Sequence, residues 1–100
     1  MKFIIYSRDK QGALDIRTSN RDAHLAFLKQ GGSVQSGPVD VLSAGPWLDA
    51  AAETMIGSLL IVETDTLETV HTWLKDDPYT QAGLPEHVNI HPFIWAIGAP

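Results

Sequence analysis

The sequence predicts an α+β fold in which strands and helices follow one another in the order β-α-β-β-α-β. Two observations predict this order: four runs are rich in β-branched and aromatic residues, and two other stretches carry apolar residues at helical spacing. In a chain of 100 residues, the order is typical of the ferredoxin-like split βαβ arrangement, a four-stranded antiparallel sheet with two helices on one face. The length fits one domain, residues 1–100.

The first half of the pattern begins with a strand over residues 2–8. Residues 9–18 are polar and are expected to form a connection. Two residues that commonly cap helices, Ser19 and Asn20, then precede a helix whose apolar positions follow a helical pattern. Gly31, followed by a second glycine, is expected to end that helix, because glycine readily takes the left-handed C-terminal conformation.

The middle of the chain predicts two strands separated by a loop. Residues 34–44 are expected to form the second strand, irregular at Gly37-Pro38, because proline cannot donate a hydrogen bond to a sheet. A loop over residues 45–56 follows, with some helical propensity at its centre, and Trp47 is either its anchor or a pocket wall. Residues 57–64 are the clearest strand in the chain.

The last part predicts a second helix and a final strand. Asp65 and Glu68 have the spacing of a capping box, and the apolar positions after them share one helical face. The helix is expected to end at Asp77, because the residue before a proline avoids helical dihedral angles. Residues 79–85 are expected to be a loop and residues 87–95 a strand.

Helices on one face leave the other face of the predicted sheet uncovered. That face is expected to be largely apolar, with Ile4 or Ile5, Leu59 or Leu60, and Val88 together with Ile90. Because a monomer rarely leaves a large apolar patch in water, we expect a homodimer in which two sheets pair face to face.

The composition excludes several classes of protein. The chain has 7 Lys+Arg against 12 Asp+Glu and a net charge of -5, which repels the phosphate backbone of nucleic acids. It has no cysteine, so it has no disulfide framework, thiolate metal site or cysteine nucleophile. The apolar run at the N-terminus is too short for a signal peptide or a membrane span. We therefore expect a cytoplasmic protein that binds neither nucleic acid nor membranes.

His24 and Asp77 are the residues most suited to chemistry. His24 lies at the boundary of the buried face of the first helix, as either a hydrogen-bonded structural histidine or a general acid or base. An Asp-Pro pair such as Asp77-Pro78 is an ordinary turn signal. However, a carboxylate at a helix C-terminus meets the negative end of the helix dipole, at a cost of about 0.3–1 kcal/mol. Because both helices pack on one sheet face, His24 is a candidate for the cation that offsets this cost.

The remaining polar residues suggest no metal or cofactor site. His87 and His91 would lie about 13 Å apart on a strand, too far to share a metal ion. His71 is expected on the solvated face of the second helix. Ser58 lacks the surroundings of a catalytic serine and is either a strand residue or a pocket hydroxyl. We expect no metal and no cofactor.

Several short pieces form an ordered set along the chain, namely Asp9, Arg17, Arg21, His24-Leu25, Gly45-Pro46, Gly57-Ser58, Trp73, Asp77-Pro78-Tyr79, Ala82-Gly83-Leu84 and Pro92-Phe93. This set resembles the YCII (YciI-like) family. The ordered set is specific, above all His24 together with Asp77-Pro78-Tyr79. Residues 47–56 match no motif of the family.

The resemblance implies a dimeric α/β barrel built from the ferredoxin-like fold, with His24 and Asp77 as a catalytic pair in a pocket. One member of the family is a dehydrochlorinase that acts on a chlorinated aromatic intermediate. We therefore expect a small cofactor-free enzyme of the lyase or isomerase type. His24 would move a proton on a small cyclic or unsaturated molecule, and Asp77 would orient His24. Ser58, Tyr79 and Arg21 are the expected substrate-binding residues.

Two other functions fit the same residues. In a non-catalytic module that binds or senses a small ligand, the His24–Asp77 pair would be structural. The other alternative is that the chain binds haem or quinone, because it would then resemble haem- or quinone-binding proteins that share the dimeric barrel.

Overall fold

The computed structural model describes residues 1–31 and 38–99 of the chain. In this part of the chain, four strands and three helices follow one another. Their bounds are β1 Lys2–Asp9, α1 Leu14–Gln30, β2 Asp40–Leu48, β3 Met55–Glu63, α2 Leu67–Leu74, α3 Pro78–Gln81 and β4 Pro85–Phe93. The predicted order of strands and helices is confirmed, with the short helix α3 added where a loop was expected.

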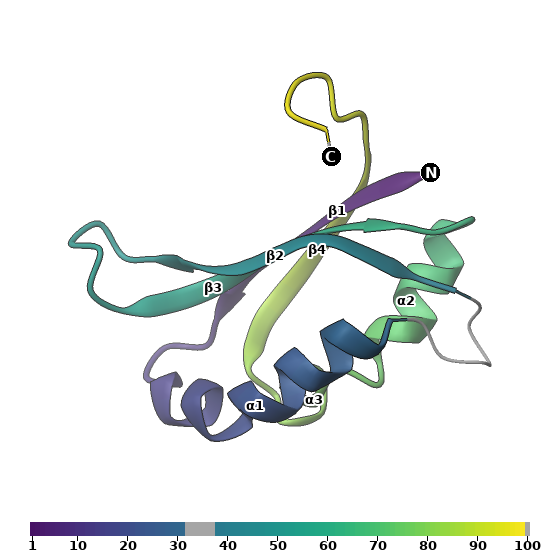
Figure 1. The fold of residues 1–100 in the computed structure, drawn as a ribbon. Helices are drawn as coiled ribbons and strands as arrows, with labels where there is room; N and C mark the ends of the chain where they lie inside the picture. Colours follow the sequence, from purple (N-terminus) through teal and green to yellow (C-terminus); the bar gives the residue numbers. More distant parts are fainter. Residues whose placement is uncertain (32–37, 100) are drawn as a thin grey trace.

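The strands form one antiparallel sheet in the order β2-β3-β1-β4. β1 and β3 lie at its centre, with Lys2 opposite Glu63 and Arg8 opposite Gly57. The helices lie on one side of this sheet (Figure 1). This is the ferredoxin-like arrangement, so the predicted fold class is confirmed. None of the helices in the described ranges is long and apolar enough to cross a membrane.

The core lies between the helices and the covered face of the sheet. Alternate residues of the two central strands enter it, Phe3 and Ile5 from β1 and Leu60 and Val62 from β3. Trp73 of α2 packs against these side chains and is completely buried. Each such side chain contributes about 1.5–3 kcal/mol through burial.

Helix α1 begins earlier than the sequence predicts. The expected connection over residues 9–18 is wrong from Leu14 onward, and the N-cap is Ala13 instead of Ser19 or Asn20. The first turns carry no apolar stripe, because Leu14 is exposed and the residue buried there is the charged Arg17. Gly31, with φ 78, ends the helix as predicted. The glycine after it lies outside the described residues.

Strand β2 extends through Gly45-Pro46 to Leu48 and β3 begins at Met55, so the loop expected over residues 45–56 is wrong at both of its ends. Residues 34–37, where the second strand was expected to begin, lie outside the described residues. β2 is an edge strand, and an edge tolerates a proline such as Pro46 because no ladder bond depends on its nitrogen. A turn follows β2, and the central part of the expected loop, which has some helical propensity, forms no helix. In this turn the Asp49 carboxylate accepts hydrogen bonds from the backbone N–H groups of Glu53 and Thr54.

Trp47 and Gly57 form a cross-strand pair near the end of β2 and the start of β3. The indole of Trp47 lies over Gly57 so closely that a Cβ atom added to Gly57 would overlap the ring. The indole nitrogen of Trp47 donates a hydrogen bond to the Ser7 carbonyl of β1, at 3.1 Å. Trp47 therefore joins three strands, which makes it an anchor in a strand instead of in a loop.

The second helix is shorter than predicted. Thr66 caps α2, its hydroxyl accepting from the backbone N–H of Thr69, so the capping box of Asp65 and Glu68 is wrong. α2 ends at Leu74, and Asp77 begins the separate helix α3. Asp77 is therefore an N-cap, and the expected unfavourable position at a helix C-terminus is wrong. Its Oδ1 accepts a hydrogen bond from the Tyr79 backbone at 3.0 Å.

The uncovered face of the sheet carries fewer apolar residues than expected. Val88 and Ile90 of β4 lie opposite Ser7 and Ile5, and Ile90 packs against the core beneath the helices. The apolar residues on the uncovered face of the central strands are Ile4, Tyr6, Leu59 and Ile61. Trp95 lies half-buried beyond the end of β4, against Phe93.

Candidate active site

His24 and Asp77 form a buried ion-pair contact between α1 and the start of α3. His24 Nδ1 lies 2.8 Å from Asp77 Oδ1. Only 6% of His24 and 4% of Asp77 are exposed. The contact joins residues 53 positions apart in the sequence. The pairing expected from the helix-packing argument is therefore present, although Asp77 reaches it from an N-cap.

The local folding of the chain fixes both members of this pair. His24 lies on the buried face of α1, about two helical turns after Arg17 and one turn before Leu28. Asp77 Oδ1 accepts from both the His24 ring and the Tyr79 backbone, so the cap holds the carboxylate in place. With Nδ1 of His24 bonded to Asp77, Nε2 is the ring nitrogen left for a substrate.

Tyr79 lies against both His24 and Arg17. Its ring stacks on the His24 imidazole, with centroids 3.8 Å apart and planes inclined by 14°. The guanidinium carbon of Arg17 lies 4.8 Å from the centre of the Tyr79 ring, within cation–π range. Burial raises the pKa of the Tyr79 phenol, and the nearby cations Arg17 and Arg21 offset this only in part. Tyr79 is therefore a neutral ring at physiological pH.

Arg17 joins α1 to two strands of the sheet. Its Nε and Nη2 donate to the two carboxylate oxygens of Asp9, at 2.7 and 2.8 Å. Nη2 also donates to Ser58 Oγ of β3, at 2.7 Å. Burial alone would lower the pKa of Arg17, but the hydrogen bonds and the charge of Asp9 outweigh it, and the pKa is raised. Arg17 is therefore a fixed cation inside the protein.

A cavity of about 90 Å³ opens beside these groups. All the charged or polar residues that line it belong to one cluster, namely Arg17, Arg21, His24, Ser58 and Tyr79. A smaller hollow of about 20 Å³ adjoins them and is lined by Asp77 as well. The structure thus places the five predicted site residues, His24, Asp77, Ser58, Tyr79 and Arg21, around one region, and their roles there stay predictions.

Sequence reasoning missed the parts that Asp9 and Arg17 play. Both matched the family pattern, but nothing local showed that they are buried together. Arg17 lies two helical turns before His24 on the same face, and a buried arginine needs a carboxylate partner. That spacing, with Asp9 as the last residue of the opening strand, was the available signal.

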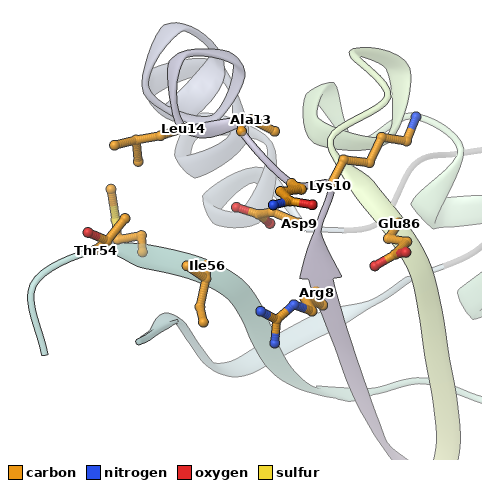
Figure 2. Close-up of a pocket in the computed structure, with 11 residues that line it drawn as sticks. Arg8, Asp9, Lys10, Ala13, Leu14, Thr54, Ile56 and Glu86 are labelled. Carbon is orange, nitrogen blue, oxygen red and sulfur yellow. The ribbon is translucent and has the colours of Figure 1, made fainter. Parts of the chain in front are cut away.

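A larger cavity of about 490 Å³ lies at one end of the sheet, between the start of α1 and the β2–β3 turn (Figure 2). Of its charged residues, Arg8, Lys10 and Glu86 are exposed, and only Asp9 is buried. The buried, mutually oriented ionisable groups lie instead around the smaller cavity. The candidate active site is therefore the smaller one, and Asp9 borders the larger cavity while it holds Arg17.

Within residues 1–31 and 38–99, no three or more histidine, aspartate or glutamate side chains gather closely enough to hold a metal ion. The described geometry offers proton-transfer groups and hydrogen-bond donors.

Residues 1–94 match the family model of the YCII-related domain. The chain belongs to this family. Protein YciI of Escherichia coli O6:H1 is 37% identical over 97 residues, covering 93% of this chain and 96% of that protein. An uncharacterized protein of Haemophilus influenzae is 31% identical over 98 residues, with the same coverage.

A solved structure is also similar over nearly the whole chain. It is the 5-chloro-2-hydroxyhydroquinone dehydrochlorinase TftG from Burkholderia phenoliruptrix AC1100, in complex with 2,5-dihydroxybenzoquinone. TftG is 33% identical to the chain, with a TM-score of 0.80 and coverage of 94% of each chain. A protein with a similar structure and sequence therefore binds a small ring molecule.

Proposed function

We propose that this YCII member is a small enzyme that needs no cofactor and uses His24 and Asp77 for general acid–base chemistry on a small cyclic or unsaturated molecule. The observation that carries the proposal is the 2.8 Å contact between His24 Nδ1 and Asp77 Oδ1 at the wall of a cavity. In such a pair the carboxylate holds the imidazole in one tautomer and stabilises its protonated form.

The proposed reaction begins when His24 Nε2 takes a proton from the substrate. The electron pair left on the substrate then shifts within the ring or expels a leaving group as an anion. In the first case His24 returns the proton to another atom, which is an isomerisation. In the second case the proton passes to solvent, which is an elimination. Asp77 stays ionised and stabilises the imidazolium. Ser58, Tyr79 and Arg21 bind the substrate.

The likeness to TftG supports an elimination of this type. That protein is named a dehydrochlorinase and was solved with 2,5-dihydroxybenzoquinone. Flat aromatic groups such as the stacked rings of Tyr79 and His24 are suited to contact with a planar ring. The first substrate to test is therefore 5-chloro-2-hydroxyhydroquinone, followed by other oxygenated rings that carry a leaving group.

Two variants test whether the pair is catalytic or structural. We expect His24→Ala and Asp77→Asn to lower kcat for chloride release by about 10²–10⁴-fold, the usual contribution of general acid–base catalysis. Asparagine also caps helices well, so Asp77→Asn keeps the bond to the Tyr79 backbone while it removes the charge. The matched control is His71→Ala, an exposed histidine on α2.

The competing role is a structural pair in a protein that binds or senses a ligand without reaction. In that case the two variants would unfold at lower temperature and lose ligand binding in parallel with folding. Unchanged kcat in a well-folded His24→Ala protein would contradict the catalytic proposal directly.

We further propose that the chain forms a homodimer, as a dimeric α/β barrel, through the uncovered face of the sheet. Ile4, Tyr6, Leu59 and Ile61 form an apolar strip along the centre of that face. The volume of the cavity also supports a second copy. About 90 Å³ is less than the roughly 150 Å³ of a cavity that encloses benzene. A ring substrate would extend out of the site, where a partner could cover it.

A further inference from the structure

Ser58 differs from the other residues of the cavity, because its side-chain oxygen already accepts a hydrogen bond from a buried cation. Arg17 Nη2 donates to Ser58 Oγ at 2.7 Å, and the serine is buried. A hydroxyl that accepts from a guanidinium has its own proton directed elsewhere. Among the described residues, the bond from Arg17 is the one side-chain hydrogen bond that Ser58 Oγ makes. Since Ser58 lines the cavity, an acceptor in the cavity would receive it.

Asp9 makes this arrangement rigid. It holds Arg17 by two parallel hydrogen bonds, the geometry that fixes a guanidinium most firmly. Both Nη2 hydrogens are then used, one on Asp9 and one on Ser58. Nη2 cannot turn toward a ligand without losing one of these bonds, whereas the two N–H groups of Nη1 are not part of them. The bonds hold the guanidinium against Ser58, and the serine hydroxyl, polarised by this cation, is a donor that lines the cavity.

We propose that Asp9 and Arg17 are positioning residues that make Ser58 a dedicated hydrogen-bond donor, and that the site selects ring substrates bearing an ionised oxygen, such as a phenolate or an enolate. This inference rests on the proposed function for the identity of the site. Arg21, which lines the same cavity, adds positive charge that a neutral ring would not use. The donor and the base have separate roles: Ser58 holds the oxygen anion while His24 moves the proton.

The test compares two probes that share a ring. 2,5-Dihydroxybenzoquinone ionises readily because each hydroxyl is conjugated to a carbonyl, whereas 2,5-dimethoxybenzoquinone has no hydroxyl to ionise. We expect the wild-type protein to bind the first more tightly. We expect Ser58→Ala to weaken that binding by about 10- to 100-fold, the usual effect of losing a hydrogen bond to a charged group. Binding of the dimethoxy compound should change less than about twofold.

Three further variants separate positioning from folding. Ser58→Thr keeps the hydroxyl and should restore the preference for the ionised probe. Asp9→Asn should reduce that preference while Ser58 is still present, because it loosens Arg17. Ser43→Ala, an exposed serine on β2, is the matched control and should bind as the wild type does. Binding is measured by calorimetry on proteins whose circular dichroism matches the wild type.

The outcomes distinguish this inference from the proposed function. Equal binding of the ionised probe by wild type and folded Ser58→Ala would overturn the inference, as would an equal loss for both probes. Neither result depends on turnover. If the wild type discriminates between the probes but His24→Ala retains full kcat, the inference stands and the proposed acid–base role fails.

Discussion

The guanidinium of Arg17 is the most completely buried charge in the described part of the chain, with 2% of the residue exposed. A buried cation is tolerated when a carboxylate and other acceptors surround it, and Asp9 and Ser58 meet that need. Composition and periodicity show where charges occur, but not which of them are buried together. For this reason His24 and Asp77 were predictable from their motif, whereas the role of Arg17 was not.

Removing Arg17 should therefore cost more stability than removing a neighbouring arginine. We expect Arg17→Met to lower the free energy of unfolding by about 3–5 kcal/mol, because it leaves the Asp9 carboxylate buried without its partner. Arg21→Met, on the same helix but exposed, should change it by less than about 0.5 kcal/mol. Urea denaturation of the two proteins measures both values. Similar midpoints would contradict the structural importance of the Arg17–Asp9 pair.

Tyr79 should make stability depend on pH in the alkaline range. Because burial raises the pKa of its phenol, the folded protein keeps this proton at pH values where the unfolded chain has lost it. The resulting stability is complete below the ordinary tyrosine pKa of about 10 and is lost as the pH rises through the folded pKa. We expect the stability of the wild type to fall more steeply above about pH 10 than that of Tyr79→Phe. Parallel curves in urea titrations would argue against a raised pKa.

At the scale of the elements, strand and helix types were predictable while several boundaries were not. The first turns of α1 were missed because their buried residue is charged, so the apolar pattern begins only later in the helix. β2 was ended too early because Gly45-Pro46 is a common turn signal, although an edge strand accepts it. In both places the deciding factor is the position of the element in the sheet, which local sequence does not contain.

The packing of Trp47 on Gly57 gives a sharp test of the β2–β3 pairing. A methyl group on Gly57 would overlap the indole and displace Trp47 from its hydrogen bond to Ser7. We expect Gly57→Ala to destabilise the protein by about 1–3 kcal/mol, as overpacking usually does. Gly45→Ala is the control, because a Cβ there meets no atom within 4 Å. Thermal unfolding measures both, and equal melting temperatures would show that the indole has room to move.

At the scale of the whole molecule, the order of the elements was enough to predict the sheet and its uncovered face. It was not enough to predict which apolar residues lie there, because the alternation along β4 depends on its register with β1. Val88 and Ile90 were expected to contribute to the uncovered face and lie on the helix side instead. The apolar strip is therefore narrower than predicted, and it is centred on β1 and β3.

The proposed dimer predicts that a charge on this strip separates the copies. Leu59 on β3 and Leu67 on α2 are both 40% exposed, but only Leu59 lies on the uncovered face. We expect the wild type and Leu67→Glu to sediment as dimers and Leu59→Glu to sediment as a monomer, because a buried, unpaired carboxylate disfavours association. Analytical ultracentrifugation distinguishes these species. A monomeric wild type would contradict the proposal.

The members of the site come from both halves of the chain: Arg17 and His24 precede the turn between β2 and β3, and Ser58 and Asp77 follow it. Neither half could therefore recognise a ligand alone. Residues 50–53 in that turn are exposed, so a cut there would leave two fragments held together only by the sheet and the packing of the helices. If the cut protein still bound ligand, its two fragments would have to be associated. Ligand binding could therefore be used to measure whether the two separate fragments reassemble.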